Sequence, residues 1–520
     1  MSRTVNSVKN IVTSYANQLL MLLLNFVVRT ALIRYLGEEY LGINGLFTNI
    51  LSLLSLAELG VGTAISFKLY GLLEKDDKRK IRIYMKMYKT IYTAIGGIIV
   101  FLGILIVPFL KHIINDYEKV AGMGINVSFV FLLYVFNSAA TYWFMAYKQV
   151  IVKAAQKTYK LTTWGYGIFI ASSVAQILVL KFTKNFILYT TVIIVFNILL
   201  NLVYARIASK LYPYINEKTS EHITKKEAIG LFKDCGALLL YKINSAVINA
   251  SDNIVLSAVK GIHIVGLYSN YTVILLSAKG LFLRFFESIE ASIGSIHATG
   301  NLSWKQNVFK TVNFISVWIH TVGAVGIAVL CDELMQVWLG DRFILDTFVY
   351  NNETYTLPIR YLAAAELYLA GFEGFLAKFR TSFGLFQQLK FRPIISMTTN
   401  LIITIILVPF MGVAGAMIGT LVASLTIFMI DPLVIHKHEL KCSPLRYFLM
   451  NVIYTVVAFF AVVASEALCK LTPYGTWGTL VLHGAICVVV SSALFLGVFC
   501  RTYACKTLAQ TIKDVIKKRK

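Results

Sequence analysis

Polar and charged side chains recur at helical spacing inside segments that are otherwise apolar. In the apolar run 233–257, four such residues follow one another at intervals of three, four and three: Lys242, Ser245, Asn249 and Asp252. This spacing places them on one face of a helix. A lysine on that face can compensate an anion, and a carboxylate can bind a coupling ion.

Similar stripes occur in other apolar runs of the chain. The polar positions that matter most are Gln18, Asn25 and Arg29 in the first run, Glu58 in the second, Arg284 in the eighth, and Glu366 and Glu373 in the tenth. A lysine or aspartate at the centre of a bilayer costs about 2.5 to 3.5 kcal/mol. These faces are therefore expected to point into protein or water.

Each of these residues also has a structural interpretation. Arg29 lies near the end of its helix and could extend to the membrane interface instead of a cavity. Arg284 could be neutralised by Glu287 one turn away, whereas Lys242 lies too deep for easy snorkelling and favours the cavity. The carboxylates are either ion-coupling groups or partners in ion pairs between packed helices, and both roles stay open for Glu58, Asp252, Glu366 and Glu373.

The elements that must position these residues are transmembrane helices. Of the 520 residues, 57% are hydrophobic and 14% charged, and the mean hydropathy is +0.70, so the chain has too little polar surface for a water-soluble globule. We predict an all-α integral membrane protein of about fourteen spans. The expected spans are 11–33, 41–67, 90–112, 122–146, 161–181, 185–206, 233–257, 264–292, 308–331, 358–380, 393–410, 411–434, 446–468 and 476–500.

The net charge is +23, but the basic residues are distributed along the chain as expected for membrane topology, which does not indicate nucleic-acid binding. Lysine and arginine gather in bursts near residues 80, 155 and 225 and at 513–520, each after an even-numbered span. The alternate connections carry few bases. By the positive-inside rule, both termini are expected in the cytoplasm.

An internal repeat divides the chain. Residues 45–49 (GLFTN) match residues 266–270 (GLYSN), and the offset between the two copies spans an even number of helices. The copies would therefore have the same orientation in the membrane, which predicts two six-helix lobes in parallel repeat. The expected organisation is an N-lobe at 1–206, a cytoplasmic linker at 207–232, a C-lobe at 233–434, two accessory helices at 435–500 and a basic cytoplasmic tail at 501–520.

No arrangement of residues indicates an enzyme. The sequence has no Walker loop, no GxSxG and no HExxH motif, and neither the eight histidines nor the seven cysteines show metal-ligand spacing. We therefore expect no catalytic residues, no metal and no cofactor, apart from a coupling ion, H⁺ or Na⁺.

Five motifs resemble the polysaccharide flippases of the multidrug/oligosaccharidyl-lipid/polysaccharide exporter superfamily. They are residues 29–37 (RTALIRYLG), 39–47 (EYLGINGLF), 57–62 (AELGVG), 265–271 (VGLYSNY) and 409–416 (PFMGVAGA). The resemblance covers nearly the whole chain, and the last motif is similar to that family's eleventh-to-twelfth hairpin.

The resemblance implies two lobes that alternate in access around a central cationic cavity, which handles an oligosaccharide on polyprenyl diphosphate. By resemblance, the substrate-binding cations would be Arg29, Lys242 and Arg284, with Arg29 the best motif match. The cavity would be lined by Gln18, Asn25, Ser245 and Asn249. One departure is that Glu287 and Glu290 leave less positive charge around Arg284 than a diphosphate favours. Related peptidoglycan-lipid flippases add two helices that form a groove for the lipid tail.

We therefore expect a flippase of the bacterial plasma membrane that moves undecaprenyl-diphosphate-linked polysaccharide repeat units to the outer leaflet by alternating access, driven by an ion gradient. Its expected partners are the lipid bilayer, the polyprenyl-diphosphate-linked oligosaccharide, and the polymerase and glycosyltransferases of the same pathway, with no nucleic acid. A drug or small-cation antiporter of the same superfamily is the alternative, although those antiporters typically lack the last two spans. A membrane-embedded glycosyltransferase, ligase or polymerase is a third interpretation, but the external loop 332–357 is short for one.

Overall fold

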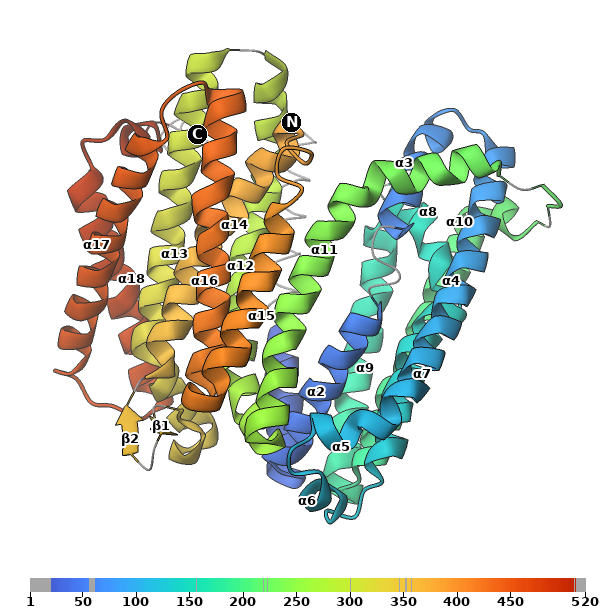
Figure 1. The fold of residues 1–520 in the computed structure, drawn as a ribbon, viewed down its shortest axis with the longest axis horizontal. Coiled ribbons are helices and arrows are strands. Elements are labelled where there is room, and N and C mark those ends of the chain that lie inside the picture. Colours follow the sequence, from blue (N-terminus) through green and yellow to red (C-terminus); the bar gives the residue numbers. More distant parts are fainter. Residues whose placement is uncertain are drawn as a thin grey trace. The chain divides into compact units, whose positions relative to one another are not determined.

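The structure is a computed structural model, and each segment where the sequence predicts a span contains helix, within the residues it describes. The described residues are 20–55, 61–155, 157–217, 219–221, 223–299, 301–345, 347–350, 353–356, 358–508 and 510. The chain divides into two compact units, residues 1–266 and 267–520 (Figure 1). The prediction of an all-α membrane protein is confirmed.

The first unit is built from an unlabelled helix at residues 20–35 and from the helices that follow it. They are α2 (Glu38–Leu54), α3 (Val61–Glu74), α4 (Lys78–Ile106), η2 (Val107–Phe109), α5 (Leu110–Ile113), α6 (Tyr117–Ala121), α7 (Val127–Trp143), η3 (Ala146–Lys148), α8 (Gln149–Ala154), α9 (Tyr159–Thr183), α10 (Phe186–Leu211), η4 (Pro213–Asn216) and α11 (Lys225–Lys260). The predicted second span corresponds to α2 and α3 together.

The second unit contains most of α12 (Ile262–Thr299), which begins in the first unit, and all later elements. They are α13 (Leu302–Leu339), η5 (Asp341–Phe343), β1 (Thr347–Tyr350), β2 (Glu353–Thr356), α14 (Ile359–Phe383), α15 (Arg392–Met411), α16 (Val413–Ile435), the π-helical turn η6 (His436–Leu440), α17 (Leu445–Cys469) and α18 (Trp477–Phe499). The strands pair antiparallel, with Thr347 opposite Thr356. This hairpin lies in the predicted external loop and was not anticipated.

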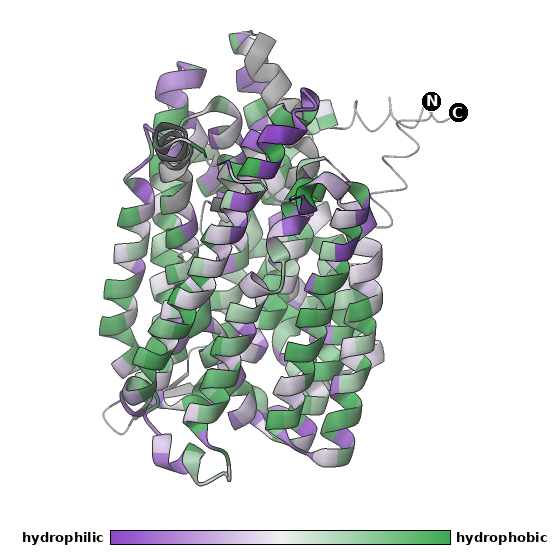
Figure 2. Cartoon of the chain, turned by 90° about the vertical axis from the view of Figure 1, so that its right-hand side faces the viewer, coloured by the Kyte–Doolittle hydropathy of each residue, from purple (hydrophilic) through white to green (hydrophobic). Residues whose placement is uncertain are grey.

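Eight of the described helices are long and apolar enough to cross a membrane, and α7 with α8, across a bend of 44°, makes a ninth. Figure 2 shows helices that are apolar through their middle and polar toward their ends. Helices α11, α12 and α14 are long but do not meet this test. They are three of the helices that carry the predicted polar stripes, so neighbouring protein or water must accept those residues.

Local sequence sets several helix ends. The Asp77 carboxylate accepts a hydrogen bond from the Lys80 amide at the start of α4, at 3.0 Å, and the Asn301 side chain does the same for the Trp304 amide of α13. These side chains satisfy amides that have no partner within the helix. At the start of α18, Thr476 and Thr479 form a reciprocal capping box.

In the first unit, α2 and the start of α12 cross at two glycines. A Cβ atom at Gly42 would collide with the Ile262 carbonyl, and one at Gly266 would collide with the Glu38 carbonyl. Only glycine allows these backbones to approach so closely. The predicted repeat motif at 45–49 follows directly, with Leu46 and Phe47 fully buried.

In the second unit, α17 and α18 pack against α13 (Figure 1). Small residues line this contact, including Ala461, Cys469 and Cys487, and they surround Val325 and Val329 of α13. At one end of the contact, the buried Glu333 carboxylate lies 2.6 Å from His483 Nδ1 and accepts a hydrogen bond from Thr479. The accessory helices α17 and α18 are therefore held against α13 by side-chain packing and, at Glu333, by hydrogen bonds.

The boundary between the compact units differs from the predicted linker. Residues 207–211 continue α10, and α11 begins at Lys225, so helix occupies both ends of the segment 207–232. Helix α11 packs on α2 and α3 and so falls in the first unit. The division into lobes at 1–206 and 233–434 stays a prediction.

Candidate substrate-binding and ion-coupling residues

Helix α11 presents three of its four predicted polar residues on the surface of the first unit. The side chains of Lys242, Ser245 and Asn249 are exposed, and the Asn249 amide donates to the Ser245 hydroxyl at 3.4 Å. Asp252, one turn further on, is buried. The exposed part of this stripe combines a cation with neutral hydrogen-bonding groups, a combination that suits an anion carried on a polar group.

Arg29 is partly buried in the helix 20–35, and Asn25, one turn earlier, is exposed. The Arg29 guanidinium lies within electrostatic range of the hydroxyl of Tyr189, a buried residue of α10. Nearby on α7, the Tyr134 hydroxyl donates to Asn44 of α2 at 2.6 Å. Arg29 therefore lies near a polar aromatic side chain of its own unit, Tyr189.

In the second unit, Glu366 of α14 pairs with Lys279 of α12. The Lys279 Nζ donates to Glu366 Oε1 at 2.6 Å, and Glu366 is almost fully buried. This contact matches the helix-packing role that the sequence left open for Glu366. Glu373, two turns further along α14, is partly exposed.

A second ionic cluster in this unit was not predicted. Asp431 of α16 is fully buried between two arginines, with Arg380 Nη1 at 2.7 Å and Arg392 Nε at 3.2 Å. From the sequence, no role is predicted for Asp431. Its partners lie on α14 and at the start of α15, so no spacing along the chain reveals them.

Three further predicted residues cannot be assigned surroundings. Gln18 and Glu58 lie outside the described residues, and Arg284 lies in α12 at a position whose side chain is not described. Their predicted roles stay predictions.

The buried face of α11 carries polar groups that were not singled out. Asn244 Oδ1, Asn253 Oδ1 and Ser257 Oγ are buried and have no hydrogen-bond partner among the described residues. Asn253 and Ser257 are one helical turn apart and close to Asp252. Oxygen ligands of this kind suit a hard cation. The signal in the sequence was the number of asparagines in a membrane span.

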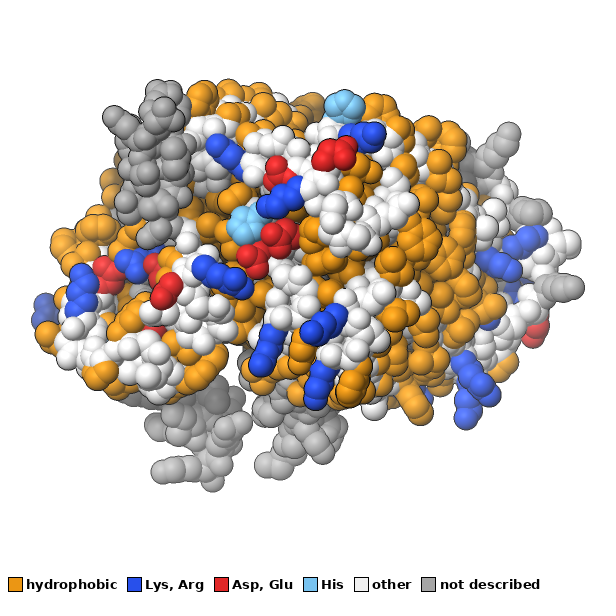
Figure 3. Space-filling view, turned by 90° about the horizontal axis from the view of Figure 1, so that it is seen from below, with side chains coloured by type: hydrophobic (Ala, Val, Ile, Leu, Met, Phe, Trp, Pro, Cys, Tyr) orange, Lys and Arg blue, Asp and Glu red, His pale blue; other side chains and the backbone are white. Residues whose placement is uncertain are grey.

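One group of side chains has the composition of a metal site. Ligand atoms of Glu38, Glu39 and His263 lie within 4.8 Å of one another. The two carboxylates are in the first turn of α2, where the helix dipole favours negative charge, and His263 Nδ1 lies 3.8 Å from Glu39. Contacts of His263 Nδ1 with Glu38 and Glu39 at 3.9 and 3.8 Å account for this group. Figure 3 shows acidic and basic side chains together on the end of the molecule seen from below.

A hollow of about 730 Å³ lies among the ends of α3, α8 and α10 in the first unit. Its lining mixes Asp76 and Glu74 with Lys157, whose Nζ lies 5.4 Å from the centre of the Tyr212 ring. Burial raises the pKa of Tyr214 to about 12, so this phenol stays protonated at neutral pH. The mixed charge favours no single class of ligand.

Solved structures with this fold are transporters. The chain is similar to the lipid II flippase MurJ in an inward closed conformation, with a TM-score of 0.61 and 14% identity over 95% of this chain and 100% of that one. It is similar to an inward-facing multidrug resistance MATE transporter of the MOP superfamily, with a TM-score of 0.58 and 13% identity over 80% of this chain and 95% of that one. A mutant of the Vibrio cholerae MATE transporter VcmN gives a TM-score of 0.53 and 13% identity over 85% of this chain and 99% of that one.

No protein-family model and no curated protein sequence matches the chain. At 13–14% identity the structural likeness establishes the fold. The chain therefore has the fold shared by MATE transporters and the MurJ flippase.

Proposed function

We propose that this chain is a flippase of the bacterial plasma membrane that moves undecaprenyl-diphosphate-linked polysaccharide repeat units to the outer leaflet by alternating access. Both termini would be cytoplasmic, and the polymerase and glycosyltransferases of the same pathway would be its partners. The observation that carries the proposal is the extent of the structural likeness. A lipid II flippase matches 95% of the chain, whereas two MATE transporters match 80% and 85%.

The accessory helices account well for this difference. The MATE transporter covers 80% of this chain and the flippase covers 95%, a difference of about 78 of the 520 residues. This number is close to the length of the segment 441–520, which contains α17 and α18. The MATE chains are matched over 95% and 99% of their own length by only 80% and 85% of this chain. A pair of helices beyond the MATE fold favours a substrate with a lipid tail over a small drug.

The side chains of the first unit supply charge compensation for a diphosphate. Lys242 is exposed beside Ser245 and Asn249, and Arg29 offers a fixed charge with forked donors. A diphosphate cannot cross hydrocarbon without such compensation. The drug antiporter has less use for these cations, because its usual substrates are themselves cationic.

We propose that the coupling ion, H⁺ or Na⁺, binds near the buried end of the α11 stripe. Asp252 supplies a carboxylate there, and Asn253 and Ser257 supply oxygen atoms on the buried face. Glu366 is held by Lys279, which leaves the partly exposed Glu373 as the second candidate among the predicted carboxylates that the structure describes. Flipping that follows an imposed H⁺ or Na⁺ gradient would support the coupling; flipping indifferent to both would contradict it.

The function is tested in proteoliposomes that contain the purified protein and an undecaprenyl-diphosphate oligosaccharide with a fluorescent sugar tag. A membrane-impermeant quencher reaches only outer-leaflet tags, so a flippase makes the protected inner pool quenchable. We expect loss of protection with the protein and retained protection in empty liposomes. Retained protection together with H⁺-dependent export of a cationic dye would favour the antiporter instead.

Arg29 gives the sharpest test of the proposed site. Arg29→Ala should abolish flipping at nearly normal protein abundance, because the lost group compensates the anion in transit. Arg29→Lys should keep partial activity, since it keeps the charge and loses the fork.

Arg34→Ala is the matched control, because Arg34 is an exposed arginine of the same helix on a different face. It should leave flipping unchanged. Wild-type flipping by Arg29→Ala at equal abundance would show that Arg29 only extends to the membrane interface.

A further inference from the structure

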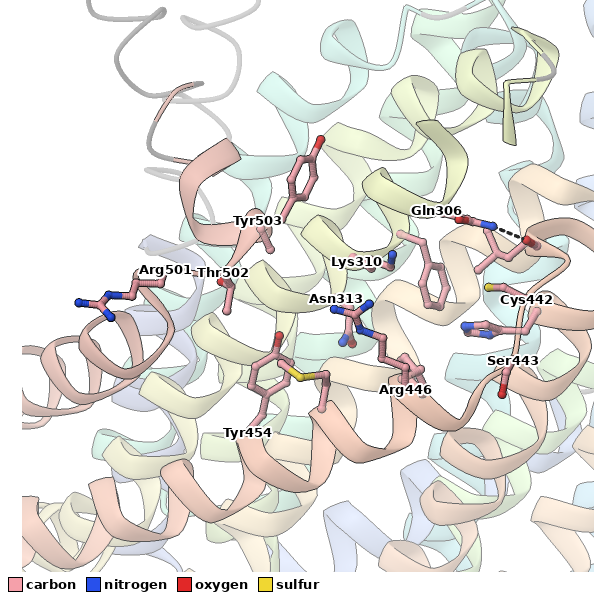
Figure 4. Close-up of a pocket in the computed structure, with 16 residues that line it drawn as sticks. Gln306, Lys310, Asn313, Cys442, Ser443, Arg446, Tyr454, Arg501, Thr502 and Tyr503 are labelled. Atoms are coloured by element: carbon pink, nitrogen blue, oxygen red, sulfur yellow. Dashed lines mark hydrogen bonds between the residues drawn. The ribbon is translucent and has the colours of Figure 1, made fainter. Parts of the chain in front are cut away.

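The second unit contains a cavity of about 540 Å³ that none of the predicted site residues lines. It lies among the start of α13, the turn η6, the start of α17 and residues 501–504 after α18 (Figure 4). Residues 306–313 of α13 therefore meet residues far along the chain. The basic segments near 440 and 501–520 predict that this end lies at the cytoplasmic surface.

Cations surround the cavity without acids. Its lining includes Lys310, Arg446 and Arg501, and no aspartate or glutamate is among the described residues that line it. In Figure 4 the Arg446 guanidinium extends toward Lys310 and Asn313, whereas Arg501 points away. Two cations thus converge on one place, which favours an anion with several oxygen atoms.

Two buried polar atoms in the same lining lack partners. The Tyr447 side chain is 8% exposed and Asn313 is 5% exposed, and neither Tyr447 Oη nor Asn313 Oδ1 has a hydrogen-bond partner among the described residues. The Asn313 amide nitrogen already donates to Asn451 at 3.1 Å. The residues that line the cavity therefore include a hydroxyl and an amide oxygen whose hydrogen-bonding capacity is unused, and leaving such groups unsatisfied is costly.

The floor of the cavity is aromatic, and its surroundings are apolar. Phe309, Tyr447 and Tyr454 are buried in its lining. Outside it, the first turns of α17 expose Leu445, Leu449 and Val452, at 62%, 56% and 59%. In a membrane protein these side chains face lipid. An anion held here would have hydrocarbon directly beside it.

We propose that this cavity binds the phosphate headgroup of a membrane lipid whose chains lie along α17. Lys310 and Arg446 bind the phosphate oxygens, Tyr447 donates its hydroxyl to the same phosphate, and Asn313 accepts from a headgroup hydroxyl. The lipid is either an anionic phospholipid, which is abundant in the cytoplasmic leaflet, or a polyprenyl phosphate. The assignment does not depend on the proposed transport function.

The test measures lipid retained by the purified full-length protein in native mass spectrometry. The probes are phosphatidylglycerol, undecaprenyl phosphate and inorganic phosphate. The double variant Lys310→Gln with Arg446→Gln should weaken binding of the preferred lipid at least about tenfold, the size of one lost charge-assisted hydrogen bond. Lys470→Gln is the control, because Lys470 is exposed at the opposite end of α17, and it should bind as wild type.

Tyr447→Phe separates binding from folding. It keeps the ring packed against Phe309, Phe428 and His436 and removes a hydroxyl that has no partner in the described protein. We expect severalfold weaker lipid binding with an unchanged or higher melting temperature when no lipid is added.

The three probes distinguish the sources of phosphate. Tighter binding of phosphatidylglycerol or of undecaprenyl phosphate identifies which lipid is preferred, and either result supports the proposal. Inorganic phosphate that competes as well as the lipids would overturn it in favour of a soluble anion. Equal lipid binding by the double variant and by the Lys470 control would overturn it altogether.

Discussion

The charged residue Lys242 of the first unit and two ionic clusters of the second unit have different surroundings. In the first unit, Lys242 is exposed on α11 together with neutral polar neighbours. In the second unit, two sets of ionic side chains between packed helices are paired and largely buried, Lys279 with Glu366 and Asp431 with two arginines. A charge within a membrane span must meet either water or a counter-charge. The first arrangement keeps a cation at a surface that a ligand can reach, and the second uses charges to hold helices together.

Among the variants that test this comparison, Asp431→Asn is expected to cause the largest loss of stability. The change leaves Arg380 and Arg392 buried without their carboxylate, and removing one partner of a buried ionic group costs about 3 to 5 kcal/mol. We expect a sharp fall in folded protein, measured as the fraction that stays monodisperse after heating in detergent.

Asp341→Asn is the control for that change, because Asp341 is an exposed aspartate of the same unit. It should melt as wild type does. If Asp431→Asn also melts as wild type does, the cluster is hydrated and the contrast between the units disappears.

A smaller effect is expected from separating Lys279 and Glu366. The Lys279 side chain is 29% exposed, so water can solvate part of its charge when the partner is lost. Glu366→Gln and Lys279→Met should each lower the free energy of unfolding by about 1 to 2 kcal/mol. The double variant should lose less than the sum of the two, which a double-mutant cycle measures.

The same variants test whether Glu366 has a second role. If its carboxylate only pairs helices, the double variant should flip substrate at a rate close to that of wild type. Loss of gradient-driven flipping in the stable double variant would instead make Glu366 a coupling group.

Much of the fold could be predicted from the sequence, because hydropathy, spacing and basic bursts are local signals. Helices occur at all the expected spans in the described residues, and α11, α12 and α14 fail the apolarity test for the reason that their polar stripes indicate. The extension of α11 back to Lys225 was missed because the helix begins with charged residues, Lys225, Lys226 and Glu227, outside the predicted apolar run.

The pairing of charges could not be predicted, because it depends on which helices pack together. Asp431 and Arg380 are 51 residues apart, and Glu333 and His483 are 150 apart. The cavity at Tyr447 was missed for the same reason, since its lining extends from residue 306 to residue 504. The sequence identifies polar helical faces by their spacing, but the counter-charges belong to the tertiary fold.

The smallest effect is expected from the double variant Ser245→Ala with Asn249→Ala, and the sign of its stability change tells whether the α11 face is wet. If water covers the face, replacing two exposed polar residues should change the free energy of unfolding by no more than about 0.5 kcal/mol. Flipping should then slow only severalfold, since Lys242 still supplies the charge. If lipid covers the face, each alanine should relieve the cost of a polar group in hydrocarbon, about 1 kcal/mol or more, and raise the melting temperature without slowing flipping. A stabilised and fully active variant would therefore place α11 against lipid, and it would remove the contrast between an exposed cation in the first unit and paired charges in the second.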